Sequence, residues 1–231
     1  MNPSKGYFIT GTDTEVGKTL VAGAMILKLR AQGLHCLAYK PVVAGVNPKT
    51  GLNDDLETLL AAMGESHGLI PQDICPYILN EAIAPHIAAN YQGVSLSLEV
   101  MLEKFRSLQE QSDEMIVEGA GGFLVPINEK YTLGDFAHRI NLEVILVVGM
   151  KLGCINHALL TVKAIEEKGL KLAGWIGNSL QEPMPYLKEN IVTLQSMLPA
   201  KFMGLIPSIP TDGLKNPLNQ ILIAKEYLIL K

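Results

Sequence analysis

A glycine-containing segment near the N-terminus has the residue types needed to bind phosphate groups. The run Gly11-Thr12-Asp13-Thr14-Glu15-Val16-Gly17-Lys18-Thr19 follows a short β-rich stretch and leads directly into a helical pattern. A helix N-terminus offers unpaired backbone N–H groups and the positive end of the helix dipole. Gly17 permits a close approach of the backbone, Lys18 can place an ammonium between β- and γ-phosphates, and Thr19 can donate a hydroxyl ligand to Mg²⁺.

The spacing of this segment departs from the common phosphate-loop pattern by one residue. G-x-x-x-x-G-K-[ST] has four residues between its glycines, whereas five separate Gly11 from Gly17, so that Thr12 holds the first position in strict register. The strand–loop–helix context still favours nucleotide-phosphate binding over a chance Gly-Lys-Thr at a helix start.

Two acidic positions are candidates for a magnesium site. Glu118 follows the hydrophobic run Met115–Val117, where a Walker-B carboxylate would lie, and the small residues of 119–122 permit close approach of a ligand. Asp54 and Asp55 begin a helical pattern, so the residues alone allow either helix capping or metal binding by Asp55.

Other charged or amide-rich positions remain ambiguous from the residues alone. Lys40 ends the second expected strand and could neutralise a phosphoryl group, but a surface lysine is the favoured interpretation. Lys151, after the most hydrophobic strand, has the same ambiguity. The amides of Gly153-Cys154-Ile155-Asn156 could hold a carboxylate or simply begin a helix.

Strand and helix patterns alternate along the chain. We expect strands at 7–10, 34–40, 115–117, 144–148, 172–178 and 202–206, and helices at 18–31, 54–63, 98–108, 155–165 and 186–198. We expect a loop at 42–53 and irregular chain at 71–85. This alternation predicts an α/β fold of the P-loop NTPase type: one domain, residues 1–231, with a doubly wound, mostly parallel sheet and helices on both faces. Ligands bind such sheets beyond the carboxyl ends of the strands.

Composition excludes several other classes of protein. The 231 residues are 48% hydrophobic with a net charge of −4 and no run of three basic residues, which argues against a nucleic-acid partner. The longest apolar run, Val144–Met150, is too short to span a membrane, and no signal-peptide pattern occurs, so we expect a cytoplasmic protein. The three cysteines are expected to be buried or incidental thiols.

Several motifs together resemble one enzyme family. The phosphate loop, with its extra residue, and the runs Tyr39-Lys40-Pro41-Val42, Pro85-His86-Ile87, 117–122 (VEGAGG) and 147–158 (VVGMKLGCINHA) are similar to those of dethiobiotin synthetases, in the same order from about residue 7 to about residue 210. The resemblance implies a reaction of 7,8-diaminononanoate and CO₂ with Mg-ATP. A carbamate forms on one amine, its oxygen attacks the γ-phosphate, and the second amine closes the ureido ring and expels phosphate.

The resemblance also implies roles for individual residues. It assigns the metal ligands as Thr19, Asp55 and Glu118 and the catalytic residues as Lys18, Lys40, Thr14 and Glu15. It assigns nucleotide contacts to Glu15, Val16, Gly17, Lys18, Thr19, Leu20, Asp55, Glu118, Gly119, Ala120, Gly121, Asn178, Ser179, Pro207, Ser208 and Ile209. It assigns substrate contacts to Thr14, Lys40, Ala44, Gly153, Cys154, Ile155 and Asn156, the last four from the partner subunit of a homodimer.

Two positions depart from the family pattern. Ala44 stands where the family often has Ser or Thr, so a hydroxyl contact with the substrate is missing. The acidic residue near the family's C-terminal nucleotide loop has only Asp212 as a candidate counterpart.

Three other functions fit a nucleotide-binding α/β chain. The first is an ATPase switch of the ParA/MinD type, which usually has a second lysine early in the phosphate loop, and residues 12–16 contain none. The second is a kinase or amidoligase for another small molecule. The third is a binding module without catalytic activity, which is disfavoured because metal-binding and phosphate-binding groups lie together at strand ends.

Overall fold

The computed structural model describes residues 6–48, 50–64, 68–180, 184–209 and 216–230. Its main sheet contains six parallel strands in the order β2-β5-β1-β6-β7-β8, and a separate parallel pair is formed by β3 and β4. The strands are β1 (Gly6–Gly11), β2 (Cys36–Tyr39), β3 (Val42–Ala44), β4 (Tyr77–Leu79), β5 (Glu114–Gly122), β6 (Glu143–Met150), β7 (Leu172–Ser179) and β8 (Lys201–Ile206).

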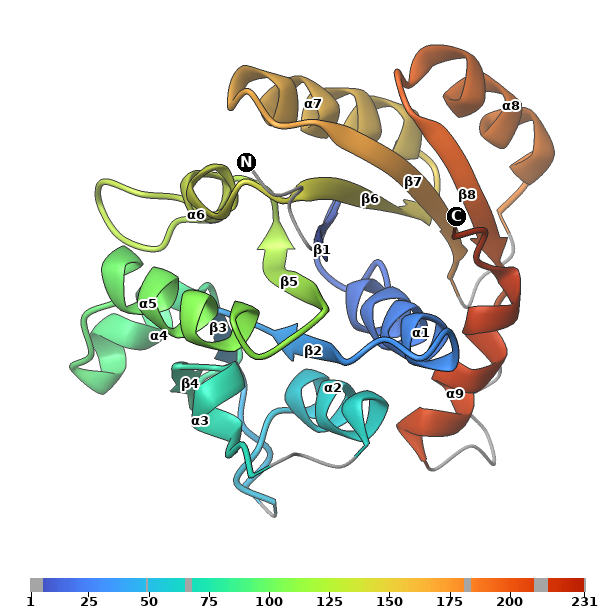
Figure 1. The fold of residues 1–231 in the computed structure, drawn as a ribbon. Helices are drawn as coiled ribbons and strands as arrows, with labels where there is room; N and C mark the ends of the chain where they lie inside the picture. The colour runs from blue at the N-terminus through green and yellow to red at the C-terminus, as the bar shows by residue number, and fades with distance from the viewer. Residues whose placement is uncertain (1–5, 49, 65–67, 181–183, 210–215, 231) are drawn as a thin grey trace.

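Helices connect and cover these strands. They are α1 (Lys18–Ala31), α2 (Asp54–Met63), α3 (Pro71–Ile74), α4 (Pro85–Gln92), α5 (Leu98–Gln109), α6 (Leu133–Ile140), α7 (Cys154–Glu167), α8 (Leu187–Met197), α9 (Pro217–Ala224) and the short 3₁₀ turn η1 (Lys225–Tyr227). Figure 1 shows α7 and α8 on one side of the sheet and α1 and α9 on the other. The expected α/β fold with a doubly wound parallel sheet is confirmed.

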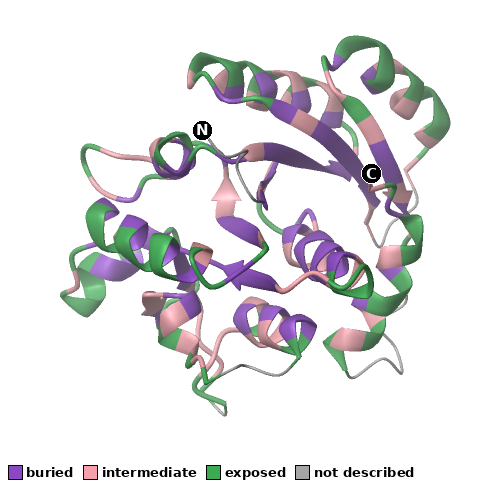
Figure 2. Ribbon diagram, in the orientation of Figure 1, coloured by how far each residue is buried: buried purple, intermediate pink, exposed green. Residues whose placement is uncertain are grey.

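Burial follows the positions of these layers. Seven of the eight residues of β6 are buried, as expected for a central parallel strand covered on both faces, and Figure 2 shows this strand almost wholly buried. An aromatic cluster joins the sheet to the helices of one face: Phe8 on β1, Tyr39 on β2, Phe105 on α5 and Phe136 on α6. The parallel pairing of β5 with β1 and β2, and of β1 with β6, holds the carboxyl ends of these four strands next to one another.

Several expected boundaries are wrong. Residues 42–53 are not all loop, because Val42–Ala44 pairs with Tyr77–Leu79 as β3 and β4. The latter strand and α3 also replace the irregular chain expected at 71–85. Short strands of three residues carry too little periodicity to be recognised without the partner strand.

Besides α3, the helices α4, α6 and α9 were not expected from the sequence. Helix α6 begins with a capping box, in which the Thr132 side chain accepts from the Asp135 N–H and the Asp135 side chain accepts from the Thr132 N–H. This T-x-x-D pattern was the available signal. The three cysteines are buried and free, as expected.

Strand β5 extends to Gly122 and is longer than the strand expected at 115–117. Glu118 therefore lies within a strand and not after it. Among the described helices, none combines the length and the apolar character that crossing a membrane requires.

Candidate active site

The phosphate loop joins the carboxyl end of β1 to the first turn of α1. The Thr12 N–H donates to the Val147 carbonyl at 3.0 Å, and the Asn178 side chain donates from Nδ2 to the Val16 carbonyl at 2.9 Å. Strands β6 and β7 therefore both hold the loop. Gly17 has a φ of 91°, and a Cβ at this position would lie 2.2 Å from Asn178 Nδ2. Glycine is required here by backbone conformation and by the close approach of Asn178.

The start of α1 is suited to an anion. Gly17 is the N-cap residue and no side chain caps the helix, so the first amides have no side-chain acceptor. Lys18 is buried, and its Nζ donates to the Asp13 carbonyl at 2.9 Å. Burial lowers the pKa of Lys18, and the nearby carboxylates of Glu118 and Asp55 oppose that effect only partly. The ammonium is thus held inside the loop by a neutral acceptor.

A second cluster lies beside Thr19 and combines one hydroxyl, two carboxylates and a lysine. Thr19 Oγ1 lies 2.7 Å from Asp55 Oδ1 and 2.8 Å from Glu118 Oε1. Lys40 Nζ lies 2.9 Å from Asp55 Oδ2 and 2.5 Å from Glu118 Oε1. Four residues therefore meet at one point, from α1, α2, β5 and the segment directly after β2.

The charges in this cluster stabilise one another. Burial alone would lower the pKa of Lys40, but the carboxylates of Glu118 and Asp55 outweigh burial and raise it. Burial would raise the pKa of Asp55, but Lys40 and Thr19 together lower it. Burial and the charge of Asp55 raise the pKa of Glu118 despite its contact with Lys40. Lys40 is accordingly protonated and Asp55 ionised at neutral pH.

The donor set of this cluster fits a hard divalent cation. Glu118 is fully buried, and its Oε2 has no hydrogen-bond partner. An unpartnered buried carboxylate oxygen is costly unless a ligand satisfies it. Together with Asp55 and the Thr19 hydroxyl it provides the oxygen ligands that Mg²⁺ prefers, with further positions left to water and phosphate. Within the described residues no group of three or more His, Cys, Asp or Glu forms another metal centre.

Two sequence interpretations of this cluster need correction. Lys40 is not a surface lysine: its side chain is 2% exposed because its charge is compensated by two carboxylates. Asp54 and Asp55 do not cap α2, because the N-cap is Asn53, whose side chain accepts from the Asp55 N–H. Asp55 is thereby free to face Thr19 and Lys40.

Other expected site residues lie at neighbouring strand ends. Ala44 ends β3, and its carbonyl accepts from the Asn53 side chain at 3.2 Å. Gly153, with a φ of 94°, precedes the first turn of α7, which contains Cys154, Ile155 and Asn156. Asn178 and Ser179 end β7, and Pro207–Ile209 follows β8. The segments after β6, β7 and β8 lie at the carboxyl edge of the main sheet, Ala44 ends a strand of the separate pair, and Asp212 lies outside the described residues.

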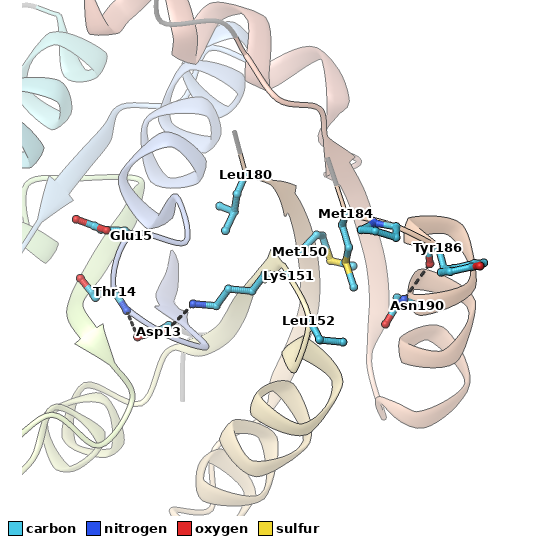
Figure 3. A pocket seen from close by; sticks show the side chains of 11 residues that line it. Asp13, Thr14, Glu15, Met150, Lys151, Leu152, Leu180, Met184, Tyr186 and Asn190 are labelled. Carbon is cyan, nitrogen blue, oxygen red and sulfur yellow. Dashed lines mark hydrogen bonds and ion pairs between the residues drawn. The ribbon is translucent and has the colours of Figure 1, made fainter. Parts of the chain in front are cut away.

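A cavity of about 1080 Å³ opens beside the phosphate loop. Figure 3 shows Asp13, Thr14 and Glu15 on one side and Lys151 extending toward Asp13 from just after β6. Met150 and Leu152, on either side of Lys151, also line the cavity. The lining is completed by Leu180, by Met184, Pro185 and Tyr186 before α8, and by Asn190 within α8. Sequence reasoning missed these last residues, because no charge or motif distinguishes them. It noted Lys151 but not its ion pair with Asp13, at 2.9 Å.

Comparison with known proteins gives the family. Residues 5–213 match the family model described as an AAA domain. ATP-dependent dethiobiotin synthetase of Aromatoleum aromaticum is 44% identical over 211 residues, covering 90% of this chain and 93% of that protein. The enzyme of the same name from Cellvibrio japonicus is 46% identical over 206 residues, covering 89% of this chain and 90% of that protein. The chain belongs to the ATP-dependent dethiobiotin synthetase family. The resemblance stated from its motifs is confirmed.

Solved structures that are similar to this dethiobiotin synthetase family member show its fold alone. The septum site-determining protein MinD of Pyrococcus horikoshii has a TM-score of 0.57 at 17% identity, with 96% of this chain and 93% of that chain covered. A ParA family ATPase of Chlorobium tepidum has a TM-score of 0.56 at 13% identity, with 98% and 92% covered. Shared architecture at such low identity carries no argument for an ATPase switch, while the sequence relatives favour a synthetase.

Proposed function

We propose that the site at the carboxyl ends of β1 and β5 closes the ureido ring of dethiobiotin from 7,8-diaminononanoate, CO₂ and ATP, releasing ADP and phosphate. The observation that carries this proposal is the convergence of Thr19, Lys40, Asp55 and Glu118 directly beside the phosphate loop. Family membership supplies the reaction, and the cluster supplies the charges that the reaction needs.

The nucleotide is bound, in this proposal, by the loop and the first turn of α1. Amides from Glu15 to Leu20 hold the phosphates, and Lys18 contacts the β- and γ-phosphates while its Nζ keeps its hydrogen bond to the Asp13 carbonyl. The segment Glu118–Gly121 borders the phosphates. Asn178, Ser179 and the turn 207–209 contact the base. Asn178 already donates to the Val16 carbonyl, which supports its position near the loop.

A magnesium ion would be held by the Thr19 hydroxyl, Asp55 and Glu118. When bound, it neutralises phosphate charge and orients the terminal phosphate. The charge of Lys40 opposes the rise in the pKa of Glu118 that burial causes, and so favours the ionised form that a metal would bind.

The chemical steps need little acid–base machinery. One substrate amine adds to CO₂ and releases a proton, giving a carbamate. A carbamate oxygen attacks the γ-phosphorus and ADP leaves. The second amine then attacks the carbamoyl carbon, the bond from that carbon to the phosphate oxygen breaks, and the ring closes. The proton that the amine loses goes to the departing phosphate. Lys18 and Lys40 stabilise the anionic groups during both transfers, while Thr14 and Glu15 orient the diamine.

A homodimer is part of the proposal, with the carboxylate of the substrate held by Gly153–Asn156 of the second copy. Exposed apolar side chains support it: Leu152 is 95% exposed and Tyr186 is 76% exposed, and both line the cavity beside the loop. A second copy would bury them. A single domain and a cytoplasmic location, where ATP is available, complete the proposal.

The decisive experiment measures phosphate release and dethiobiotin formation while omitting ATP, diamine, bicarbonate or Mg²⁺ in turn. Both products should require all four components. Phosphate release that continues without the diamine would instead indicate an ATPase switch.

Residue roles are tested by Lys18→Met, which should lower turnover by about 10³-fold or more, and by Asp55→Asn, which should raise the Mg²⁺ concentration for half-activity by about 10- to 100-fold. The matched control is Asp54→Asn, an exposed neighbour on the same turn.

Measuring the molecular mass in solution tests the proposed homodimer, and a fully active monomer would contradict it.

A further inference from the structure

Asp13 connects two residues of the phosphate loop to a lysine that follows β6. Its Oδ1 accepts from the Thr14 N–H at 2.8 Å, and its backbone carbonyl accepts from Lys18 Nζ at 2.9 Å. Its Oδ2 lies 2.9 Å from Nζ of Lys151, which is 138 residues away in the sequence. Lys151 therefore contacts the same residue that orients Thr14 and Lys18.

The loop needs such support because its backbone is strained. Glu15 has a φ of 56°, a left-handed conformation that a residue with a Cβ adopts only when its surroundings compensate for the cost. On the Val16 side, Asn178 of β7 supplies a contact. On the Asp13 side, the corresponding side-chain contact comes from Lys151 at the end of β6.

Figure 3 shows the Lys151 side chain extending across the cavity toward Asp13 and Thr14. The hydrogen bond from Lys151 lowers the pKa of Asp13, so the carboxylate is ionised at neutral pH and the contact is an ion pair. Neither side chain belongs to the cluster around Thr19 that would hold a metal.

We propose that Lys151 and Asp13 are a positioning pair, which holds Thr14 and Lys18 in the geometry that the reaction requires. This inference rests on the proposed function, and it adds two residues to which the family resemblance gives no role. Lys151 acts through Asp13 and not on the phosphates themselves.

The solvent exposure of the two side chains distinguishes a role in positioning the loop from a role in folding stability. Both side chains are 42% exposed, and an ion pair with that exposure contributes little to folding. A shift of about 1 Å in a reacting group, in contrast, can cost about 100-fold in rate. Losing the pair should therefore change turnover far more than stability.

The test compares Lys151→Met, Asp13→Asn and the double variant with Lys104→Met. Lys104 forms an ion pair of similar exposure with Asp73, at 3.4 Å, on α5 and α3. Asparagine at position 13 keeps an oxygen for the Thr14 N–H but loses the charge that pairs with Lys151.

Each single variant should lower kcat about 10- to 100-fold with the KM for ATP within about threefold. The double variant should be no worse than the poorer single variant, and Lys151→Arg should restore most of kcat. Lys104→Met should match the unchanged protein, and the unfolding midpoints of Lys151→Met and Lys104→Met should agree.

Other kinetic results would overturn the proposal. Unchanged kcat, losses that multiply in the double variant, or a raised KM for ATP with unchanged kcat would show that Lys151 does not act through Asp13.

A second measurement needs no turnover, so it tests the pair even if the enzyme forms no dethiobiotin. Amide hydrogen exchange across residues 12–17 in the ligand-free protein should be at least about tenfold faster in Lys151→Met than in Lys104→Met. Equal exchange would end the proposal.

Discussion

Replacing Lys40 with methionine should destabilise the fold as well as abolish turnover. Lys40 is buried, and its ammonium faces the fully buried carboxylate of Glu118 at 2.5 Å and Asp55 at 2.9 Å. Methionine fills a similar volume but leaves Glu118 buried beside another carboxylate. The perturbation is therefore almost purely electrostatic.

The expected loss in the free energy of unfolding follows from the burial of the ion pair. Removing one member of a buried ion pair typically costs about 3–5 kcal/mol, because the remaining charge stays desolvated. For a chain of this length, that loss corresponds to a decrease in the unfolding temperature of about 6–20 °C. The control is Lys104→Met, which removes the exposed ion pair of Lys104 with Asp73. That variant should lose no more than about 1 kcal/mol of the free energy of unfolding.

The assay is urea unfolding followed by the fluorescence of the single tryptophan. Trp175 is fully buried on β7, and its ring centroid lies 4.5 Å from that of Phe202, so its emission reports loss of the core. Adding Glu118→Gln to Lys40→Met should recover at least half of the lost free energy of unfolding, because the fully buried carboxylate is then neutral. Asp55 also loses Lys40, but its side chain is 45% exposed and keeps its hydrogen bond from Thr19.

Two results would refute this reasoning. One is a Lys40→Met variant with the unfolding midpoint of Lys104→Met, which would mean that the buried charge costs nothing. The other is a double variant less stable than Lys40→Met, which would mean that Glu118 does not carry the penalty.

Further predictions concern the loop and a helix cap. Gly17→Ala should lower the free energy of unfolding by about 2–3 kcal/mol, from left-handed strain and displacement of Asn178, and should weaken ATP binding measured by calorimetry. Gly33→Ala, at a φ of 84° with open space around it, should cost about 1 kcal/mol, and equal losses at the two sites would contradict the role of Asn178. Burial would raise the pKa of Asp135, but hydrogen bonds, chiefly from Lys168, lower it. Its stabilisation is therefore present above the unfolded pKa of about 3.9 and is lost as pH falls through the lower folded pKa. Asp135→Asn should thus cost about 1 kcal/mol at pH 7 and progressively less below about pH 4, measured by urea unfolding; a cost that does not depend on pH would exclude the charge as its cause.

Local patterns were sufficient to predict much of the fold. The phosphate loop, α1 and the buried strand β6 are recognisable because their signals lie within contiguous residues. Strands β3 and β4 were missed because each gains its hydrogen bonds from the other, more than 30 residues away. Helix α6 carried a legible capping signal at Thr132 and Asp135 that the apolar periodicity alone did not reveal.

The sequence by itself determined the family, the parallel α/β architecture and the phosphate loop, since each depends on residue types at short spacings. Only the tertiary structure decided that Lys40 is buried between two carboxylates and that Lys151 is paired with Asp13. Thr19 meets Asp55 and Glu118 across 36 and 99 residues of chain. Charge interactions and desolvation depend on distance in space and on burial, and neither quantity can be read from separation along the chain.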